Sequence, residues 1–433
     1  PEIKEDEIPF EIPKSWKWVR LENIVSKNIK RGKSPKYAEK SGTIVFAQKC
    51  NSKYTGIRLD LALYLNEDTL SRYDKSEFLQ NNDIVINSTG GGTMGRVGRY
   101  QNKDNPNNLP VVPDSHVTVI RAISKINAIY LFYYIKNNQS FLEMVGDGST
   151  NQTELKPLVL KNLLIPLPPI AEQKRIVDKI EKHFSVIDKA EEQLNKKIAL
   201  NEKIREKVLQ MAIQGKLVEQ RSDDGTAEEL FSQIQEEKLK LISEGRLKKE
   251  KPLPEIKEDE IPFEIPKSWK WAKLNDIGNW KSGSTPSRSN KVYFDNGTIP
   301  WLKTGDLKDG FVDFISENIT ELALKKLPLT LHHKNTVLIA MYGATIGKLG
   351  ILKFPATTNQ ACCACSCYEG VFFKFLFYFL MSIRKNLIKQ AKGGAQPNIS
   401  KEIVINTLFP LPPIAEQKRI VEKVESIFSK LDS

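Results

Sequence analysis

The sequence is poor in the residues and runs on which several classes of protein depend. Its 433 residues include only five cysteines and four histidines. No stretch approaches the roughly 20 apolar residues that a membrane-spanning helix needs. The best candidate, residues 371–381, is short and is interrupted by Lys374. The N-terminal segment is acidic and polar, unlike a secretory signal. We therefore expect neither a membrane protein nor a secreted one.

The cysteines are too few and too close together to build a disulfide framework. Cys362, Cys363, Cys365 and Cys367 fall within six residues, and Cys50 stands alone. This spacing does not match the paired ligand pattern of a zinc site. On a strand, every second cysteine of the run would point to the same buried face. We expect buried thiols, no bound metal, and a reduced, cytoplasmic setting.

Sequence signatures of catalysis are missing as well. There is no nucleophile elbow, no HExxH motif and no dinucleotide fingerprint. Clear methyltransferase, helicase and nuclease signatures are also absent. Residues 343–348, GATIGK, superficially resemble a P-loop, but the spacing is one residue short and Leu349 stands where magnesium needs Ser or Thr. We expect a chain that is not an enzyme and binds no cofactor.

What the sequence does contain is an excess of positive charge. Lysine and arginine outnumber aspartate and glutamate by 65 to 53, which gives a formal net charge of +12. Such an excess suits a polyanionic partner, because cationic side chains release counterions from phosphates when they bind. Charge alone leaves open a protein that is merely soluble and basic.

The chain is also an internal repeat. Residues 1–18, PEIKEDEIPFEIPKSWKW, recur unchanged at 254–271, and PLPPIAEQKRIV at 166–177 recurs at 410–421. The segments between these blocks match only faintly. A drifted duplication explains the different middles but not the preserved ends. We interpret the repeat as one scaffold that presents two different binding surfaces.

The repeat predicts an α+β protein with two similar mixed α/β domains, at 1–168 and 251–411. A central helical region is expected at 169–250, and the truncated start of a C-terminal conserved helix at 412–433. The apolar pattern predicts a long helix over about 170–213 and a second over about 227–244. Within the two domains it predicts strands at 43–47, 83–87, 117–120, 299–302 and 336–340, and helices at 129–135 and 372–383.

The apolar stripe of the long helix needs a partner helix. At 1.5 Å per residue this helix would be roughly 65 Å long. The natural partner is the copy at 414–431, as an antiparallel coiled coil, but that copy stops after about five turns. We therefore expect a shortened chain or a partner helix from another chain. The expected interface side chains are Ile176, Ile180, Phe184, Ile187, Leu194 and Ile198, with Ile420, Val424 and Phe428.

Basic and polar side chains gather at matching places of the two domains. They occur in a basic loop (27–40 and 281–291), after a matching strand, and beside a glycine turn. Such side chains suit contacts with phosphates and base edges, although a basic solvated loop remains the alternative. The candidates in the first domain are Lys30, Arg31, Lys33, Gln48, Lys49, Asn51 and Arg96. Those in the second are Ser284, Thr285, Arg288, Lys303, Thr304, Asp306 and Lys348.

These features together resemble the specificity subunit of type I restriction-modification enzymes. The likeness rests on the two PLPPIAEQKRIV blocks, the EIPFEIPKSWKW entries, QGKLV at 214–218 and GTAEEL at 225–230. It implies that each domain reads one half of a bipartite double-stranded DNA site, and that the conserved helices set the gap between the halves.

The same resemblance implies the partners of the chain. Two modification subunits would dock on the helices and methylate adenine with S-adenosylmethionine, and restriction subunits that use ATP and magnesium would join them. The leading alternative is a two-domain helical scaffold that binds proteins rather than DNA. A nuclease or methyltransferase with an unfamiliar site is a third interpretation, which would require activity from the chain alone.

Overall fold

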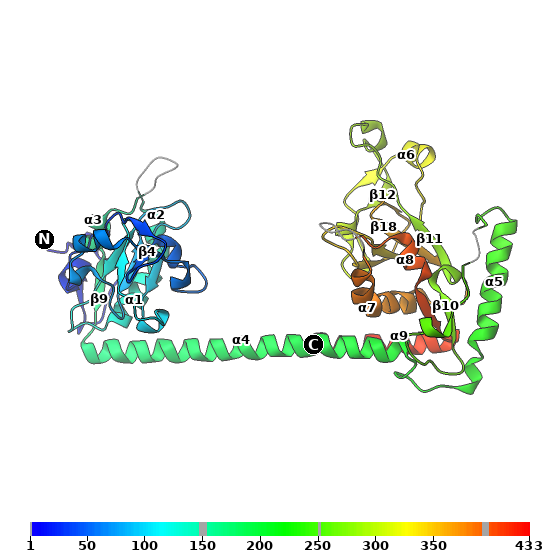
Figure 1. Ribbon diagram of the computed structural model, residues 1–433, viewed down its shortest axis with the longest axis horizontal. Helices are drawn as coiled ribbons and strands as arrows, with labels where there is room; N and C mark the ends of the chain where they lie inside the picture. The colour runs from blue at the N-terminus through cyan, green and yellow to red at the C-terminus, as the bar shows by residue number, and fades with distance from the viewer. Residues whose placement is uncertain (1, 147–153, 250–252, 392–397) are drawn as a thin grey trace. The chain divides into compact units, whose positions relative to one another are not determined.

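A computed structural model describes residues 2–146, 154–249, 253–391 and 398–433. The chain divides into two compact units, Pro1–Glu192 (unit 1) and Gln193–Ser433 (unit 2) (Figure 1). The division falls inside helix α4 (Ile170–Ile213), which is the long helix expected from the sequence. This two-part division is coarser than the four predicted regions, whose boundaries stay predictions.

Unit 1 is a mixed α/β unit that contains two small sheets besides a two-stranded ladder described below. The first sheet has the order β2 (Tyr37–Ala38), β4 (Leu63–Leu65), β3 (Ile44–Phe46) and β7 (Val111–Pro113). The second has the order β6 (Val97–Arg99), β5 (Ile84–Asn87) and β8 (Val117–Ile120). The helices are α1 (Ala128–Asn137), α2 (Gln139–Met144), α3 (Pro157–Asn162) and the start of α4. Leu21, Leu131 and Leu160 lie in its core, fully buried.

Unit 2 repeats this arrangement with a larger second sheet. The larger sheet has the order β11 (Gly278–Ser282), β18 (Cys362–Cys367), β15 (Val337–Ala340), β16 (Leu349–Leu352) and β13 (Gly310–Val312). The smaller has the order β14 (Asn318–Ile319), β12 (Ile299–Leu302) and β17 (Thr357–Thr358). Its helices after α4 are α5 (Ala227–Ser243), α6 (Glu321–Lys326), α7 (Phe373–Lys389), α8 (Lys401–Asn406) and α9 (Ile414–Asp432).

The two units share one topology. In each, a strand pairs antiparallel with one neighbour and parallel with another: β3 with β4 and β7 in unit 1, β12 with β14 and β17 in unit 2. In each, a central strand lies between two antiparallel partners, β5 between β6 and β8, and β15 between β16 and β18. The predicted mixed fold in two similar copies is confirmed. Helix α7 runs six residues beyond the predicted end at 383, because Leu387 continues its buried face.

The preserved sequence blocks pair with each other in both units. Strand β1 (Lys17–Arg20) of the entry block pairs with β9 (Leu164–Leu167), and β10 (Lys270–Lys273) pairs with β19 (Leu408–Leu411). Trp18 lies opposite Pro166, and Trp271 lies opposite Pro410. The blocks therefore join the two ends of the variable segment in each unit, which gives a physical reason for their preservation.

Helix α9 packs against the last part of α4 within unit 2. Asn201 Nδ2 donates to the backbone oxygen of Leu431 at 2.8 Å, and the Arg205 guanidinium lies 4.5 Å from the Phe428 ring centre. The other end of α9 lies near the chain that follows α4, where Arg419 pairs with Asp224 at 2.6 Å. The two helices are therefore antiparallel over this part. Buried side chains between the elements of this core include Val208, Leu209, Ile213, Ile420 and Val424.

The cysteine run is part of the core of unit 2. Cys362, Cys363 and Cys365 are fully buried on β18, and Cys50 is fully buried in unit 1. Burial raises the pKa of Cys363 to about 12, so its thiol is protonated at neutral pH. The prediction of buried thiols is confirmed for these four cysteines, whereas Cys367 is only partly buried. Within the ranges that the structure describes, no three His, Cys, Asp or Glu side chains are grouped so as to hold a metal ion. No helix in those ranges has the length and hydrophobicity that crossing a bilayer requires.

His332 of unit 2 is buried without a hydrogen-bond partner for Nε2 among the described residues. Burial lowers its pKa to about 4, with help from the charges of His333 and Lys281. Its folded form therefore stays neutral at pH values where an exposed histidine takes up a proton.

This buried histidine predicts a loss of stability in mild acid. Between about pH 6.5 and pH 4 the unfolded chain binds a proton that folded His332 excludes, so the free energy of unfolding should fall as the pH drops through this window. His332→Asn should show a shallower fall. Thermal unfolding of both proteins across the window measures the difference, and identical slopes would contradict the assignment.

Candidate nucleic-acid interface

The basic loop of unit 1 lies against strands β7 and β8. Gly32 makes this approach possible, because a Cβ at this position would lie 2.2 Å from the backbone oxygen of Pro113. Its backbone N–H donates to Val117 O at 2.9 Å. On either side, Arg31 forms an isolated bridge with Thr118 of β8, and Lys33 forms one with Asp114, the residue after β7. The backbone of the candidate residues 30–33 is thus held by the sheets.

Glu77 gathers two of the candidate cations of this loop. Its carboxylate oxygens lie 2.9 Å from Lys30 Nζ and 2.5 Å from Lys33 Nζ. Burial acts to raise the pKa of Glu77, but the hydrogen bonds from Lys33 and Lys30 outweigh it and hold the pKa at about 2. Arg31 pairs instead with Glu154, at 3.1 Å. The structure therefore brings Lys30 and Lys33 together at Glu77, whereas Arg31 pairs with a different acid, Glu154.

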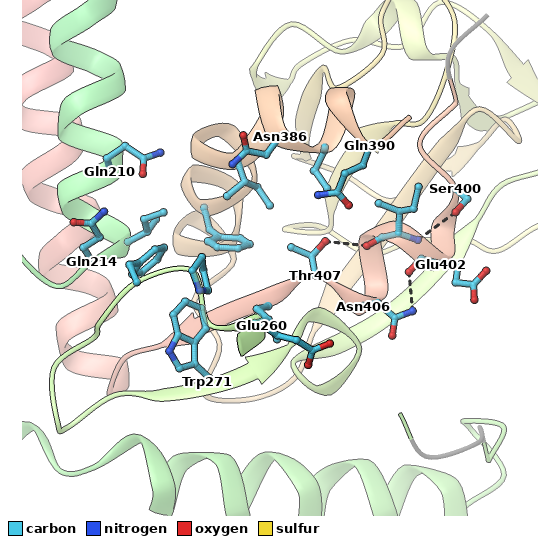
Figure 2. A pocket seen from close by; sticks show the side chains of 18 of the residues that line it. Gln210, Gln214, Glu260, Trp271, Asn386, Gln390, Ser400, Glu402, Asn406 and Thr407 are labelled. Carbon is cyan, nitrogen blue, oxygen red and sulfur yellow. Dashed lines mark hydrogen bonds between the residues drawn. The ribbon is translucent and has the colours of Figure 1, made fainter. Parts of the chain in front are cut away.

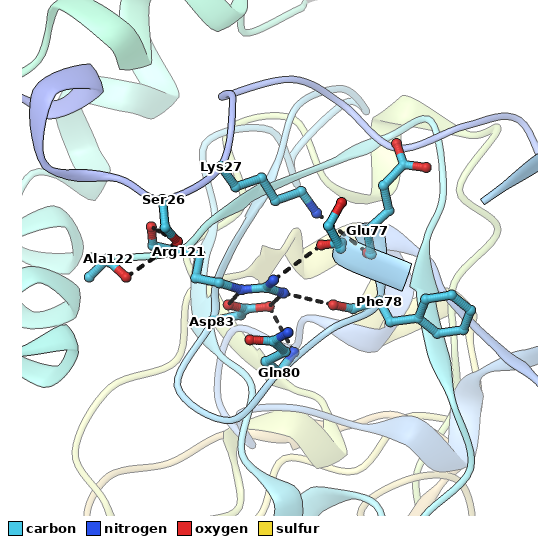
Figure 3. Close-up of polar contacts among 9 residues, drawn as sticks. Ser26, Lys27, Glu77, Phe78, Gln80, Asp83, Arg121 and Ala122 are labelled. Atoms are coloured by element: carbon cyan, nitrogen blue, oxygen red, sulfur yellow. Dashed lines mark hydrogen bonds and ion pairs between the residues drawn. The ribbon is translucent and has the colours of Figure 1, made fainter. Parts of the chain in front are cut away.

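The short helical turn that carries Glu77, Lys75–Glu77, is fastened to the sheet by Arg121 (Figure 3). Arg121 makes a two-pronged ion pair with the buried Asp83, with hydrogen bonds of 2.8 Å from Nε and 2.7 Å from Nη2. It also donates to the backbone oxygens of Ser76 at 3.1 Å and Phe78 at 2.7 Å, on both sides of Glu77. The position of the Glu77 backbone thus depends on a pair inside the unit.

Lys27 lies beside the same turn. Its Nζ donates to the backbone oxygen of Glu77 at 3.4 Å. Burial, together with the nearby charge of Arg121, lowers the pKa of Lys27 to about 8. Lys27 therefore supports the turn rather than presenting an exposed charge.

A second group of unit 1 candidates surrounds the glycine turn before β6. Arg96 Nη1 donates to Asn51 O at 2.9 Å, and Thr93 Oγ1 donates to Gln48 Oε1 at 3.3 Å. The Asn51 side chain is only 1% exposed and donates to Asn87 Oδ1 at 3.2 Å. The expectation that Asn51 reads a base edge does not fit this burial; its amide holds the turn from inside. Lys49 is exposed nearby, so three of these four candidates remain accessible or partly accessible.

The corresponding loop in unit 2 is held in the same way. A Cβ on Gly283 would lie 2.1 Å from the backbone oxygen of Thr358, and the next residue, Ser284, donates its N–H to that oxygen at 3.0 Å. Ser284 O accepts from Trp301 Nε1 at 3.0 Å, and Thr285 Oγ1 donates to the Gln360 side chain. Ser284 and Thr285 are thereby fixed beside the end of β12.

Arg288 is the central cation of this group. Its guanidinium lies 4.8 Å from the ring centre of Phe294 and 5.1 Å from that of Trp301. It pairs with Glu317 at 2.7 Å, and Lys303 pairs with the other oxygen of the same carboxylate. The hydrogen bond from Lys303 and the ion pair with Arg288 hold the pKa of Glu317 below its ordinary value. Aromatic stacking and an ion pair together restrict a long, flexible side chain.

The remaining candidates of unit 2 lie outside the Arg288 group. Thr304 and Asp306 form a short turn in which Asp306 Oδ2 accepts from the backbone N–H of Lys303 at 2.9 Å. Lys348 pairs with Asp309 at 2.8 Å, and Asp309 also pairs with Arg384. Lys348 and Arg384 therefore share Asp309, and their contacts are separate from those of the Arg288 group.

Sequence reasoning missed the acids that organise these cations. Glu77, Asp309 and Glu317 stand outside the basic loops, and their partners lie between 14 and 75 residues away in the chain. Charge patterns within a short window carry no signal for such pairs. Trp301 and Phe294 could have been noticed, because aromatic residues interleaved with basic ones are a known feature of nucleic-acid surfaces.

A cavity of about 980 Å³ in unit 2 has a different character (Figure 2). It lies among the end of α4, α7, α8 and the entry block, and amide, aromatic and aliphatic side chains line it. Among the described residues, the charged ones that line it, Glu260 and Glu402, are both acidic. Acids repel phosphate, so this cavity is not part of the candidate DNA surface. Its lining includes Gln210, Gln214, Asn386, Gln390, Asn406, Phe263, Trp271 and Phe379.

Solved structures share the fold. A chain from a study of the complex assembly and conformational transition of the type I R-M system superposes with a TM-score of 0.63 at 19% identity, covering 98% of this chain and 93% of that one. The HsdS subunit from Thermoanaerobacter tengcongensis gives a TM-score of 0.58 at 18% identity, covering 98% and 92%.

Sequence comparisons identify the family. The EcoAI specificity subunit of Escherichia coli is 25% identical over 99% of this chain and 80% of its own length. The MjaVIII specificity subunit of Methanocaldococcus jannaschii is 26% identical over 96% and 87%. The model of the type I restriction modification DNA specificity domain matches residues 13–200 and 266–433. The chain therefore belongs to this family, as a DNA specificity subunit of a type I restriction-modification system with two target recognition domains and no catalytic role of its own.

Proposed function

We propose that each unit reads one half of a bipartite double-stranded DNA target. The observation that carries this is the pair of loops held at Gly32 and Gly283, which have the same backbone support and different side chains. Lys30, Arg31 and Lys33 face one half, and Ser284, Thr285 and Arg288 the other. Arg and Lys favour guanine edges, Gln favours adenine, and Ser or Thr accept several bases, so different side chains at matching places read different sequences.

We propose that the modification subunits dock on helix α4. Four apolar side chains of its predicted stripe are about half exposed in the described structure: Phe184 (49%), Ile187 (51%), Leu194 (57%) and Ile198 (50%). Ile176 and Ile180 of the same stripe are partly buried, whereas Ile420 and Val424 of α9 are buried in unit 2. A long exposed apolar stripe is typical of a helix that packs against another helix. S-adenosylmethionine, ATP and magnesium would then be held by the partner subunits, in the cytoplasm.

Adenine methylation mapping tests this function directly. Genomic DNA from cells that contain the modification subunit is compared with and without this chain. We expect methylation at one motif that consists of two short halves with a fixed gap, and only when the chain is present. Methylation that is absent or unaltered would count against the proposal.

The alternative is a scaffold that binds proteins through its two units. The amide-lined, acidic cavity of unit 2 is the observation that favours it, because it suits a peptide better than a phosphate backbone. A scaffold would bind DNA weakly and without strong salt dependence. A reader that contacts several phosphates should lose affinity steeply as salt rises, so a titration over salt separates the two.

The basic loop of unit 1 provides a specific prediction. Replacing Lys30, Arg31 and Lys33 together by glutamine should weaken binding to the first half-site by at least about tenfold. The slope of binding affinity against salt concentration should also become shallower, by the amount expected for the loss of about two to three phosphate contacts. The second half-site is the internal control, because its side chains are unaltered. A changed base preference at the second half would contradict the assignment of one half to each unit.

A further inference from the structure

We propose that Glu77 in unit 1 and Glu317 in unit 2 are positioning residues, each of which fixes a pair of cations for contact with one half of the DNA target. This inference rests on the proposed function, because the cations are the candidate DNA contacts. Neither acid would touch DNA itself. Each would fix the positions of two cationic side chains.

In each unit one carboxylate uses its two oxygens for two different cations. Glu77 forms ion pairs with Lys30 and Lys33, and Glu317 forms ion pairs with Arg288 and Lys303. A carboxylate can accept several hydrogen bonds, and bonds between ionised groups are stronger than neutral ones. Two cations that would otherwise repel each other are thereby held a few ångströms apart around one acid.

The acids lie deeper than the cations that they hold. The Glu77 side chain is 10% exposed, whereas those of Lys30 and Lys33 are 52% and 35% exposed. The Glu317 side chain is 27% exposed, against 56% for Arg288 and 38% for Lys303. A phosphate or base edge that approaches from solvent therefore meets the cations before the carboxylate. Two cations and one acid leave a net positive charge at each place.

Each acid is itself fixed by its backbone. Glu77 closes a capping box with Asp74, whose N–H donates to Glu77 Oε2 at 3.0 Å, and Arg121 fastens the same turn. Glu317 O accepts from Trp301 N at 2.9 Å, next to the paired strands β12 and β14. The two glutamates therefore have fixed backbones, whereas the lysine and arginine side chains that they pair with are long and flexible. Fixing a flexible side chain before binding reduces the entropy that binding costs.

The two arrangements are not a remnant of the duplication. Glu317 comes just before β14, which corresponds to β4 of unit 1, whereas Glu77 comes after β4 and before β5. The acids thus occupy different points of the shared topology and reach matching loops from different directions. The same solution at two unrelated positions favours a role in the function that the units share, rather than inherited packing.

The expected effect combines two changes of opposite direction. Glu317→Gln removes one negative charge, so affinity for DNA of unrelated sequence should rise severalfold at low salt. It also releases Arg288 and Lys303, so the preference for the correct second half over a scrambled one should fall by about tenfold, the scale of one well-placed base contact. A loss of fold alone would lower both affinities together.

The experiment uses the full chain assembled with its modification subunits. Fluorescently labelled duplexes carry the mapped target, the target with only its second half scrambled, or unrelated sequence, and affinities are measured over a salt series. Asp313→Asn is the matched control, because Asp313 pairs with Lys353 on an exposed part of unit 2 and its loss changes the net charge equally. The control should raise affinity for unrelated DNA without altering the preference at the second half.

A variant that lacks the cations separates positioning from general packing. In a chain with Arg288→Gln and Lys303→Gln, adding Glu317→Gln should change the preference at the second half by less than about twofold, since nothing remains to be positioned. A further tenfold loss in that background would overturn the inference, as would an unaltered preference in Glu317→Gln alone. If Glu317→Gln does not fold, Glu77→Gln gives the same test at the first half.

The preference of the wild-type complex for the mapped target separates a failure of this inference from a failure of the proposed function. If the wild type does not prefer the mapped target over its scrambled versions, the proposed function fails. If the wild type shows that preference and Glu317→Gln or Glu77→Gln retains it unaltered, only the positioning role fails.

Discussion

Replacing Asp83 by alanine should lower the free energy of unfolding of unit 1 by about 3 kcal/mol, the scale seen when one partner of a buried ion pair is removed. Asp83 is 1% exposed, and its two oxygens accept from Arg121 at 2.8 and 2.7 Å. The variant leaves the Arg121 guanidinium without its anion in a place that is only 16% exposed. It also removes the acceptor for the backbone N–H of Gln80.

Chemical denaturation followed by tryptophan fluorescence measures this loss. Asp60→Ala is a suitable control, because Asp60 also pairs with an arginine of unit 1, Arg58, but on the exposed surface. Exposed pairs contribute little, so the control should unfold at the same denaturant concentration as the wild type. An Asp83 variant that matches the control would show that the Arg121 pair does not hold the turn of Glu77.

Insertions into helix α4 should change the gap between the two halves of the methylated motif. The helix runs without a break from Ile170 to Ile213, and its exposed part lies before the segment that packs against α9. Seven added residues near position 190 extend a helix by about 10 Å and make almost two full turns, so the apolar stripe stays on one face. That length corresponds to about three base pairs of DNA. We expect methylation at a motif whose gap is longer by that amount.

A two-residue insertion at the same place is the matched control. It lengthens the helix by only about 3 Å but turns everything beyond it by about 200°. This rotation divides the apolar stripe between opposite faces, so the modification subunits should no longer assemble and methylation should be lost. Methylome mapping and gel filtration of the assembled complex give both results. An active complex with the original gap after the seven-residue insertion would refute the role of α4 as a spacer.

The elements of the fold could be predicted because their signals are local. Strands such as β8 and β12 are short apolar runs, and α4 shows an apolar repeat with no proline or glycine for 44 residues. The repeat then indicated that both units share a fold. Burial of Cys363 and Cys365 followed from their alternation on one strand, whereas Cys362 is buried on the opposite face of β18 and Cys367 is only partly buried.

The candidate site was only partly predictable, because its organisation depends on contacts between distant residues. Asn51 has the composition of a base reader, but its amide turns inward to Asn87, 36 residues away. Glu77 and Glu317 belong to no motif of the sequence, and only the folded chain places each one beside two cations. A short window of sequence does not contain the information that decides which side of a loop a side chain faces.

The pairing of β1 with β9 and of β10 with β19 has an evolutionary consequence. Because the constant blocks bond to each other, each variable segment begins and ends at the same short ladder, whatever lies between. A foreign segment that is recombined between these blocks would inherit a closed boundary and would need only to pack its own interior. Coding DNA as similar as the repeated protein blocks would at the same time offer the homology at which such crossovers start. New target specificities could therefore arise by exchange of whole cassettes rather than by gradual mutation.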